Sequence, residues 1–294
     1  IFDDNRTKNN LLDVKEELKH PKESEQLNFL NGTIKETPNT IEKDPGLTGS
    51  SKGIMEPIEV LKTHATPENI LIIDTETTGL DQAIDDCLEV GSILFNVKSR
   101  SVLAQQSFLL PVENNNAEKI NNIPAEITRL PQPFYEAIKY FESLVQFSDV
   151  VIAHNAEFDM KWFGLKKLPV IEKQWICSMD DITWPSEKQL KNRPSVRDLA
   201  LAYGVPVWNA HRALTDCIYL AEVFKRCSEL EKLLTRALEP KVLYRADISY
   251  DERHLAKKAG FRWNDAVKGS WSRKLSRRDM ERLEFPVHEV DFHN

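Results

Sequence analysis

The pattern of apolar and polar residues divides the chain into a polar N-terminal stretch and a longer part with regular apolar segments. Residues 1–66 are rich in Asn, Lys, Glu and Thr, and Pro38, Pro45 and Pro57 interrupt any long element. Too little apolar surface is present there to offset the entropy that ordering would cost. We therefore expect residues 1–66 to form a flexible segment, with short helical patches around residues 11–18 and 57–63.

From residue 67 onward, apolar runs of strand length alternate with segments of helical periodicity. The run at residues 69–74 ends in an acid, which is typical of a buried strand with a functional group at its tip. Ser195 and Gly204 are suited to begin and end a helix. The full pattern predicts strands at 69–74, 88–97, 101–110, 150–153 and 174–177, and helices at 134–147, 155–163, 195–203 and 209–227. This alternation predicts a layered α/β domain over residues 67–230.

The composition changes near residue 240, and we expect a small basic α+β module at residues 240–294. Between Lys241 and Arg282, 12 Lys or Arg residues stand against 6 Asp or Glu residues. A helix at 250–259 and a hairpin over 261–273, with Gly269 near its turn, are predicted. Aromatic and cationic residues alternate at Arg262, Trp263, Trp271, Arg273 and Lys274. These side chains could stack bases and bind phosphates of a single strand; alternatively, both Trp residues fill the core that so small a module needs.

Overall charge and cysteine use narrow the class of protein. The net charge is −7 over 294 residues, so nucleic-acid binding would depend on local basic patches or bound metal. The four cysteines lack Cys-x-x-Cys spacing, which argues against a zinc cluster or a disulfide framework and favours the cytoplasm. No apolar run of about 18 residues predicts a membrane span. The chain begins with Ile1 and has no signal pattern, so a fragment or a processed chain stays an open alternative.

Three separate segments carry acids that could meet at one metal site. Asp74 and Glu76 lie at positions i and i+2 of a strand end, so they share a face. Asp159 follows the strand at 150–153 by one helical turn, and Asp216 lies in the last helix, five residues after His211. Each segment alone could be solvated or structural, but their conjunction favours a site. Carboxylates suit Mg²⁺ or Mn²⁺ better than zinc.

These segments resemble the motifs of the DEDDh (DnaQ-like) 3′–5′ exonuclease family. Asp-x-Glu-Thr-Thr-Gly-Leu, His-Asn-Ala-x-Phe-Asp and His-x-Ala-x-x-Asp occur in the family's order, and the resemblance covers residues 69–228. The sequence Trp-Ile-Cys-Ser-Met at 175–179, followed by Trp184 and Pro185, is similar to the bacterial exonuclease X branch; the polymerase III epsilon-type branch is also close. The resemblance implies a ribonuclease H-like fold, with a central mixed sheet flanked by helices.

The resemblance also implies roles for individual residues. Asp74 would bridge two Mg²⁺ or Mn²⁺ ions, one completed by Glu76 and Asp216 and the other held by Asp159. His211 would be the general base for the water that attacks the terminal phosphodiester, which yields a nucleoside 5′-monophosphate. Implied substrate contacts are Thr77, Leu80, Ile127, Thr128, His154 and Asn155. The family's His-Gly-Ile-Thr block is replaced by Pro-Ala-Glu-Ile-Thr at 124–128, which leaves the binding of the 3′ end open.

The sequence therefore predicts a 3′–5′ exonuclease acting on DNA, on single-stranded or mismatched ends, in proofreading or DNA repair. The same chemistry on RNA or oligoribonucleotides is an alternative, because no residue decides between the sugars. A non-catalytic nucleic-acid-binding or polymerase-associated protein is a second alternative, which the presence of all four acids and His211 disfavours. A DNA polymerase or a repair protein is the expected partner.

Overall fold

The computed structural model describes residues 65–208 and 211–290. The predicted helical patches around residues 11–18 and 57–63, and almost all of the segment predicted to be flexible, lie outside this range.

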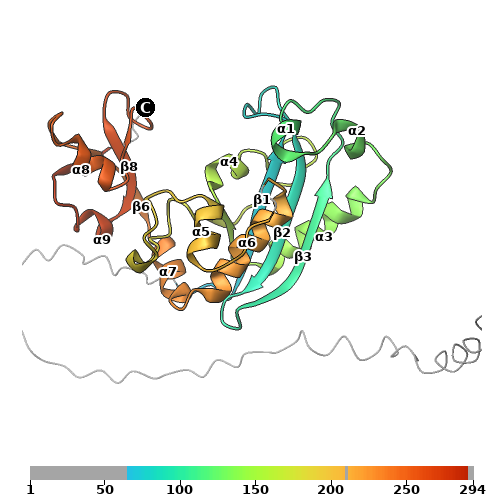
Figure 1. Ribbon diagram of the computed structural model, residues 1–294, viewed down its shortest axis with the longest axis horizontal. Helices are drawn as coiled ribbons and strands as arrows, with labels where there is room; N and C mark the ends of the chain where they lie inside the picture. The colour runs from blue at the N-terminus through green and yellow to red at the C-terminus, as the bar shows by residue number, and fades with distance from the viewer. Residues whose placement is uncertain (1–64, 209–210, 291–294) are drawn as a thin grey trace, which may run out of the picture. The chain divides into compact units, whose positions relative to one another are not determined.

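A five-stranded mixed sheet forms the centre of the first domain, in the order β3–β2–β1–β4–β5 (Figure 1). The central strand β1 pairs antiparallel with β2 and parallel with β4. At the edges of the sheet, β3 pairs antiparallel with β2, and β5 pairs parallel with β4. The strands are β1 (Asn69–Thr77), β2 (Cys87–Asn96), β3 (Ser101–Leu109), β4 (Val150–Ala153) and β5 (Gln174–Cys177). The mixed sheet predicted from the sequence is confirmed.

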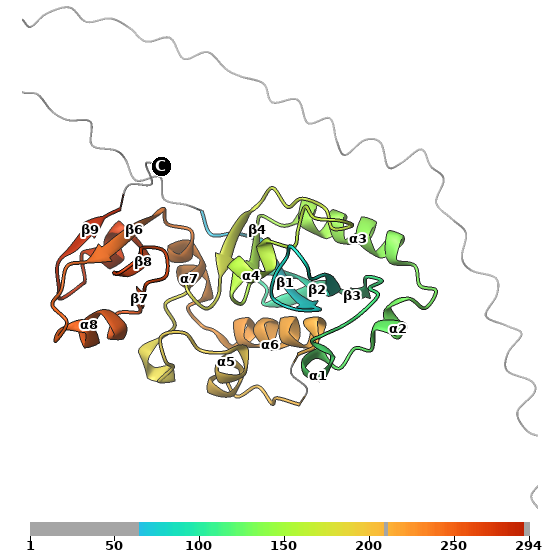
Figure 2. The ribbon, with the colours of Figure 1, turned by 90° about the horizontal axis from the view of Figure 1, so that it is seen from above.

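Helices cover both faces of this sheet, and Figure 2 shows α3 and α6 on opposite sides of it. The helices that pack on the sheet are α3 (Phe134–Phe147) and α4 (Ala156–Met160) on one face, and α5 (Val196–Ala202), α6 (Ala213–Arg226) and α7 (Leu230–Ala237) on the other. Successive residues of β1 enter different clusters: Ile70 and Ile72 pack with α6, and Leu71 and Ile73 pack with α3. A strand that is buried on both faces consists of consecutive apolar residues, which explains the uninterrupted apolar run that β1 has in the sequence.

Several predicted boundaries shift. The last helix begins at Ala213 rather than residue 209, because His211 has a left-handed φ of 65° and Arg212 is extended. The helix predicted at 155–163 ends at Met160, whereas Ser195 caps α5 as predicted. The first domain extends past residue 230, because Leu233 and other residues of α7 join its core. The short elements α1 (Glu118–Asn121), α2 (Ala125–Thr128) and the 3-10 turn η1 (Ser186–Lys188) were not predicted.

The C-terminal module is a four-stranded antiparallel sheet in the order β7–β8–β6–β9, with short helices. Its elements are β6 (Lys241–Ala246), α8 (Arg253–Lys258), β7 (Arg262–Trp263), β8 (Trp271–Ser276), α9 (Arg277–Met280) and β9 (Val287–Glu289). Tyr244, Ala256, Phe261 and Leu275 form its buried core. The predicted helix and hairpin are confirmed. Within the described ranges, no helix is long and apolar enough to cross a membrane.

Candidate active site

The end of β1 carries the first two acids. Asp74 and Glu76 lie two residues apart on this strand, which continues to Thr77, three residues beyond the predicted end. A tight turn follows, in which the Thr77 hydroxyl donates to the Gly79 carbonyl at 2.6 Å. Both carboxylates therefore sit at the carboxyl end of the central strand, where α/β sheets bind ligands.

Asp159 reaches the site from α4. Its side chain is 2% exposed, and its Oδ1 accepts a hydrogen bond from the Thr75 hydroxyl at 2.7 Å. Phe158 of α4 is half-buried and Trp162, two residues after the helix ends, is buried; both side chains pack inward, as predicted, and anchor this segment on the sheet. Thr75 was missed at the sequence level. Its position between Asp74 and Glu76 was the available signal, because a hydroxyl there can orient a neighbouring carboxylate.

His211 and Asp216 come from the start of α6. The His211 backbone N–H donates to Asp216 Oδ2 at 3.2 Å, which ties the loop to the first turn of the helix. One ligand atom from each of Glu76, His211 and Asp216 lies within 4.8 Å of the others. The structure thus brings together residues that are separated by up to 140 positions in the sequence.

Two residues of β2 determine where α6 begins. Glu89 is 1% exposed and accepts hydrogen bonds from the Arg212 guanidinium at 2.9 and 3.0 Å, and from the Ala213 N–H at 3.1 Å. The strand register places Gly91 beside Asp74, and a Cβ at Gly91 would lie 2.4 Å from the backbone of Ala213. The sequence signal was an acid and a glycine inside an otherwise apolar strand. Glu89 satisfies a helix N–H that has no partner within the helix itself, so it acts as a cap supplied by a strand.

The acids raise one another's pKa values. Burial, followed by repulsion from Asp159 and Asp216, raises the pKa of Asp74 well above its usual range. Burial and then Asp216 raise the pKa of Glu76 to about 8, and burial raises the pKa of Asp159 to about 7. Burial also raises the pKa of Asp216. Clustered carboxylates of this kind are stabilised by a cation, and a donor set of four carboxylates fits a divalent metal ion such as Mg²⁺ or Mn²⁺.

The predicted substrate contacts fall into two groups. Leu80 is 79% exposed and Ile127 on α2 is 44% exposed, so both apolar side chains are accessible. Thr77 is buried, and its hydroxyl belongs to the turn after β1. Thr128 is 0% exposed and its hydroxyl donates to the Ala125 carbonyl, so it is less accessible than Leu80 and Ile127, and its contact with substrate stays a prediction.

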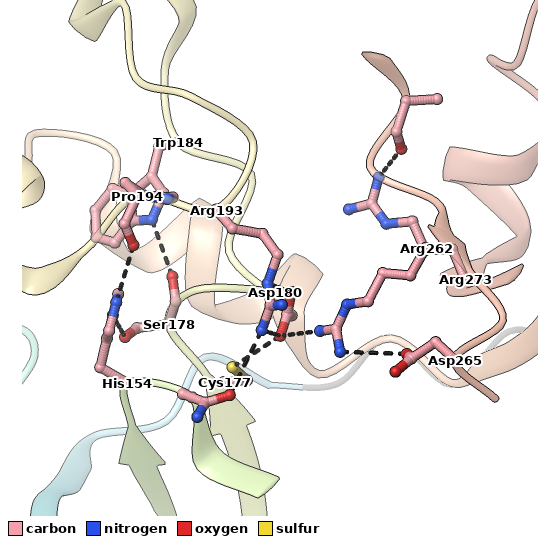
Figure 3. Close-up of polar contacts among 12 residues, drawn as sticks. His154, Cys177, Ser178, Asp180, Trp184, Arg193, Pro194, Arg262, Asp265 and Arg273 are labelled. Carbon is pink, nitrogen blue, oxygen red and sulfur yellow. Dashed lines mark hydrogen bonds and ion pairs between the residues drawn. The ribbon is translucent and has the colours of Figure 1, made fainter. Parts of the chain in front are cut away.

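His154, another predicted substrate contact, is held in place by hydrogen bonds at both ring nitrogens. Its Nδ1 lies 2.9 Å from the Ser178 hydroxyl and its Nε2 lies 2.9 Å from the Pro194 carbonyl (Figure 3). Both ring nitrogens are therefore occupied, and burial lowers the pKa of His154 to about 4. Asn155, the next residue, is exposed, and its Oδ1 accepts from Arg193 at 3.5 Å.

The aromatic and cationic residues of the C-terminal module divide in a similar way. Trp271 packs against the module core, whereas Trp263 is 57% exposed. Trp271 thus belongs to the core of the module, as the second alternative has it, and contact between the exposed Trp263 and nucleic acid stays a prediction. Arg262 forms ion pairs with Asp180 and Asp265, Arg273 donates to a backbone carbonyl, and Lys274 is exposed.

An acid cluster at the end of the central strand of a mixed sheet, with helices on both faces, defines the ribonuclease H-like class of nucleases. The chain belongs to the exonuclease family: the family model described as "Exonuclease" matches residues 71–224, just over half of the chain. A model described as a domain of unknown function matches residues 242–290. With the four acids and the histidine of the family's motifs in place, the chain is a DnaQ-like exonuclease of the DEDDh type, a family that depends on divalent metal and acts on nucleic acid.

Curated relatives and solved structures match between about half and three quarters of this chain. The DNA polymerase III subunit epsilon of Treponema pallidum is 30% identical over 160 residues, which cover 51% of this chain and 72% of the relative. The PolC-type DNA polymerase III of Thermotoga petrophila is 27% identical over 55% of this chain, and the match spans only 12% of that relative's length. The zinc-bound E. coli exonuclease I complex with single-stranded DNA has a TM-score of 0.47 at 15% identity, covering 74% of this chain and 68% of that one. The nuclease domain of 3′hExo bound to rAMP has a TM-score of 0.43 at 14% identity, covering 54% of this chain and 91% of that one.

Proposed function

We propose that this protein is a metal-dependent 3′–5′ exonuclease that releases nucleoside 5′-monophosphates from single-stranded or mismatched DNA ends. The observation that carries the proposal is the convergence of Asp74, Glu76, Asp159, His211 and Asp216 from three distant segments. DNA is favoured over RNA because the similar curated relatives are DNA polymerase III proteins.

The four carboxylates would hold two divalent cations. Glu76 and Asp216, whose ligand atoms lie within 4.8 Å of each other, would hold one ion together with Asp74. Asp159, oriented by Thr75, would hold the other with Asp74. Two Mg²⁺ or Mn²⁺ ions bound there would stabilise the negative charge on the attacking and leaving oxygens.

His211 would be the general base. Its exposed side chain lies on the loop before α6, and its backbone N–H is bonded to Asp216. Imidazole suits this role because it accepts and releases a proton near neutral pH. In the proposed reaction, a ring nitrogen of His211 takes a proton from the water whose oxygen forms a new bond to phosphorus. The bond between phosphorus and the O3′ of the preceding nucleotide breaks, O3′ takes a proton from solvent, and His211 returns its proton to solvent.

The 3′-terminal nucleotide would rest on the accessible apolar side chains. Leu80 and Ile127 would contact its base, and the backbone at Thr77 would lie near its sugar. Asn155 would border the site on the side of α4. Trp263 and Lys274 of the C-terminal module are exposed and would contact the strand further from its 3′ end.

We further propose a DNA polymerase or repair complex as the partner, since similar relatives carry polymerase names. Gel filtration of the purified chain with a replicative polymerase subunit tests this, and co-elution is the expected result. Separate elution at micromolar concentrations would count against it.

A digestion panel tests the proposed reaction and its substrate. The strands are 5′-labelled single-stranded DNA, duplex DNA with a matched or mismatched 3′ end, and RNA of the same sequence, each with Mg²⁺, Mn²⁺ or EDTA. We expect stepwise shortening of single-stranded and mismatched DNA with metal, slower shortening of RNA, and none with EDTA. Faster digestion of RNA than of DNA would contradict the assigned substrate.

A further inference from the structure

A polar cleft of about 190 Å³ lies between the segment after β5 and the C-terminal module. One wall comes from residues 179–192, including Lys191 and Asn192. The other comes from Lys258, Ala259 and Arg273 of the module. None of these residues belongs to the acid cluster described above.

Ion pairs hold the two walls together. Asp180 binds Arg193 at 2.8 Å and Arg262 of the module at 3.0 Å (Figure 3). The neighbouring Asp181 pairs with Lys241 at 2.7 Å, and the Asn192 side-chain amide donates to the Lys258 carbonyl at 2.6 Å. The cleft is therefore built by specific contacts on both sides.

Two cations of the cleft lack a carboxylate partner. Arg273 is half-buried and donates to the Ala259 carbonyl, and burial lowers the pKa of its guanidinium. Among the described residues, neither Arg273 nor Lys258 forms an ion pair, whereas Lys191 is paired with Asp198 at 2.9 Å. Lys258 is exposed, and the partly desolvated Arg273 is attracted by Asp279, Asp180 and Asp181 only without direct ion pairing, so an anion in the cleft would supply the direct partner that its guanidinium lacks.

The backbone makes room for this guanidinium. Gly260 has a φ of 79°, and a Cβ there would lie 2.9 Å from an Arg273 nitrogen. The left-handed conformation of Gly260 and its lack of a side chain thus both leave space for the guanidinium of Arg273. Arg273 and Lys258 line the same cleft, and a guanidinium together with an ammonium group is suited to a phosphate, which accepts several charge-assisted hydrogen bonds.

We propose that this cleft binds a backbone phosphate of the nucleic-acid strand whose 3′ end occupies the active site, an inference that rests on the proposed function. Arg193 connects the cleft to the active site. Arg193 lies 3.5 Å from Asn155 Oδ1 at the start of α4, the helix that carries Asp159, and it also binds Asp180 at the cleft. The cleft thus adds a contact upstream of the scissile bond, contributed jointly by both parts of the chain.

Lys258→Glu tests the proposal, with Lys257→Gln as the matched control, because Lys257 is the exposed neighbour whose side chain does not line the cleft. Affinity for a labelled single strand is measured by fluorescence anisotropy in EDTA over a range of KCl concentrations. Each phosphate contact of a single strand contributes about 0.7 to the salt slope, so we expect a loss of about that size and at least about threefold weaker binding. The control should bind as the wild type does.

Steady-state kinetics provide the second readout. The KM of Lys258→Glu should rise for strands of about 20 nucleotides and stay near wild type for strands of about 3, with kcat unchanged. Equal affinity and salt slope for Lys258→Glu and Lys257→Gln would overturn the proposal. Because binding is measured without turnover, that outcome is distinct from failure of the proposed function, in which no strand is shortened by the wild type. The proposal would also be overturned if inorganic phosphate stabilised the wild type but not Lys258→Glu, while both proteins bound the strand equally well.

Discussion

At the scale of single residues, the reactive groups depend on partners that the family motifs do not contain. Thr75 fixes one oxygen of Asp159, and Glu89 fixes Arg212 and the first N–H of α6. The side chains of Thr75 and Glu89 are almost fully buried. The positions of the acids therefore follow from a network that extends into β2.

Replacing Glu89 by Ala should destabilise the protein and lower its activity. The change removes the acceptor for Arg212, Ala213 and Ser107, and leaves a helix N–H without a partner. We expect a loss of about 2–4 kcal/mol in the free energy of unfolding by urea. Glu222→Ala on the same helix is the control, because it removes only surface ion pairs worth about 0–1 kcal/mol. Similar losses in both variants would contradict the role assigned to Glu89.

Replacing His211 by Ala should lower kcat by about 10²–10⁴-fold, the usual contribution of a general base. Four carboxylates stay in place, so Mn²⁺ binding measured by calorimetry should change little. His254→Ala, in the exposed helix of the C-terminal module, is the matched control and should keep full activity. A His211→Ala enzyme with wild-type kcat would show that another group takes the proton.

At the scale of secondary-structure elements, close contact between β2 and α6 assembles the site. Gly91 lies beside Asp74 in the sheet and permits the backbone of Ala213 to approach it. The left-handed loop at His211 ends where α6 begins, so His211, the proposed base, and Asp216 are carried by one short segment. The sheet register thereby determines the distance between the acids of β1 and those of α6.

The sequence predicts these elements well where local signals dominate. The apolar run ending at Asp74 and the cap at Ser195 were identified, because burial and capping leave clear patterns. The start of α6 was not identified correctly. The composition of residues 209–212 is compatible with a helix, and the boundary is decided by tertiary contacts with Glu89. The burial of Thr128 was also missed, because its hydroxyl is satisfied by the backbone of α2 and of Val112.

The strand β4 ends in a pH-sensitive contact at His154. Burial lowers the pKa of His154 to about 4, below its usual value of 6.5, so the folded protein holds it neutral. Its stabilising contribution is complete above pH 6.5 and is lost as the pH falls toward 4, because the unfolded chain binds the proton first. The loss should reach at most about 3 kcal/mol. Urea unfolding of His154→Gln should vary less with pH over this range than the wild type or the His254→Gln control; an unchanged profile would contradict the prediction.

At the scale of the whole molecule, the charge of the acid cluster links stability to metal binding. The raised pKa values of Glu76 and Asp159 mean that the metal-free protein retains protons that the unfolded chain releases. The metal-free protein should therefore lose stability as the pH rises from about 4 to about 8. A divalent cation bound at the acid cluster would take the place of the protons on Glu76 and Asp159.

Addition of Mn²⁺ should accordingly raise Tm more at pH 8 than at pH 5. Protons compete with the metal at the lower pH, whereas at the higher pH binding relieves the repulsion among carboxylates. Differential scanning fluorimetry measures the shift, and Asp74→Asn should show a much smaller one at pH 8. A Tm gain of the same size at both pH values would contradict the coupling between acid cluster and metal.

The central claim is that the four acids and His211 form a metal-dependent site that shortens DNA from its 3′ end. The most direct test is digestion of one 5′-labelled single-stranded DNA with Mn²⁺ by the wild type, Asp74→Asn and the exposed-acid control Asp251→Asn. The account predicts a ladder of products that differ by one nucleotide for the wild type and for the control, and an activity at least about 10³-fold lower for Asp74→Asn. A ladder formed equally fast by Asp74→Asn, or a labelled mononucleotide released at once from the 5′ end, would contradict it.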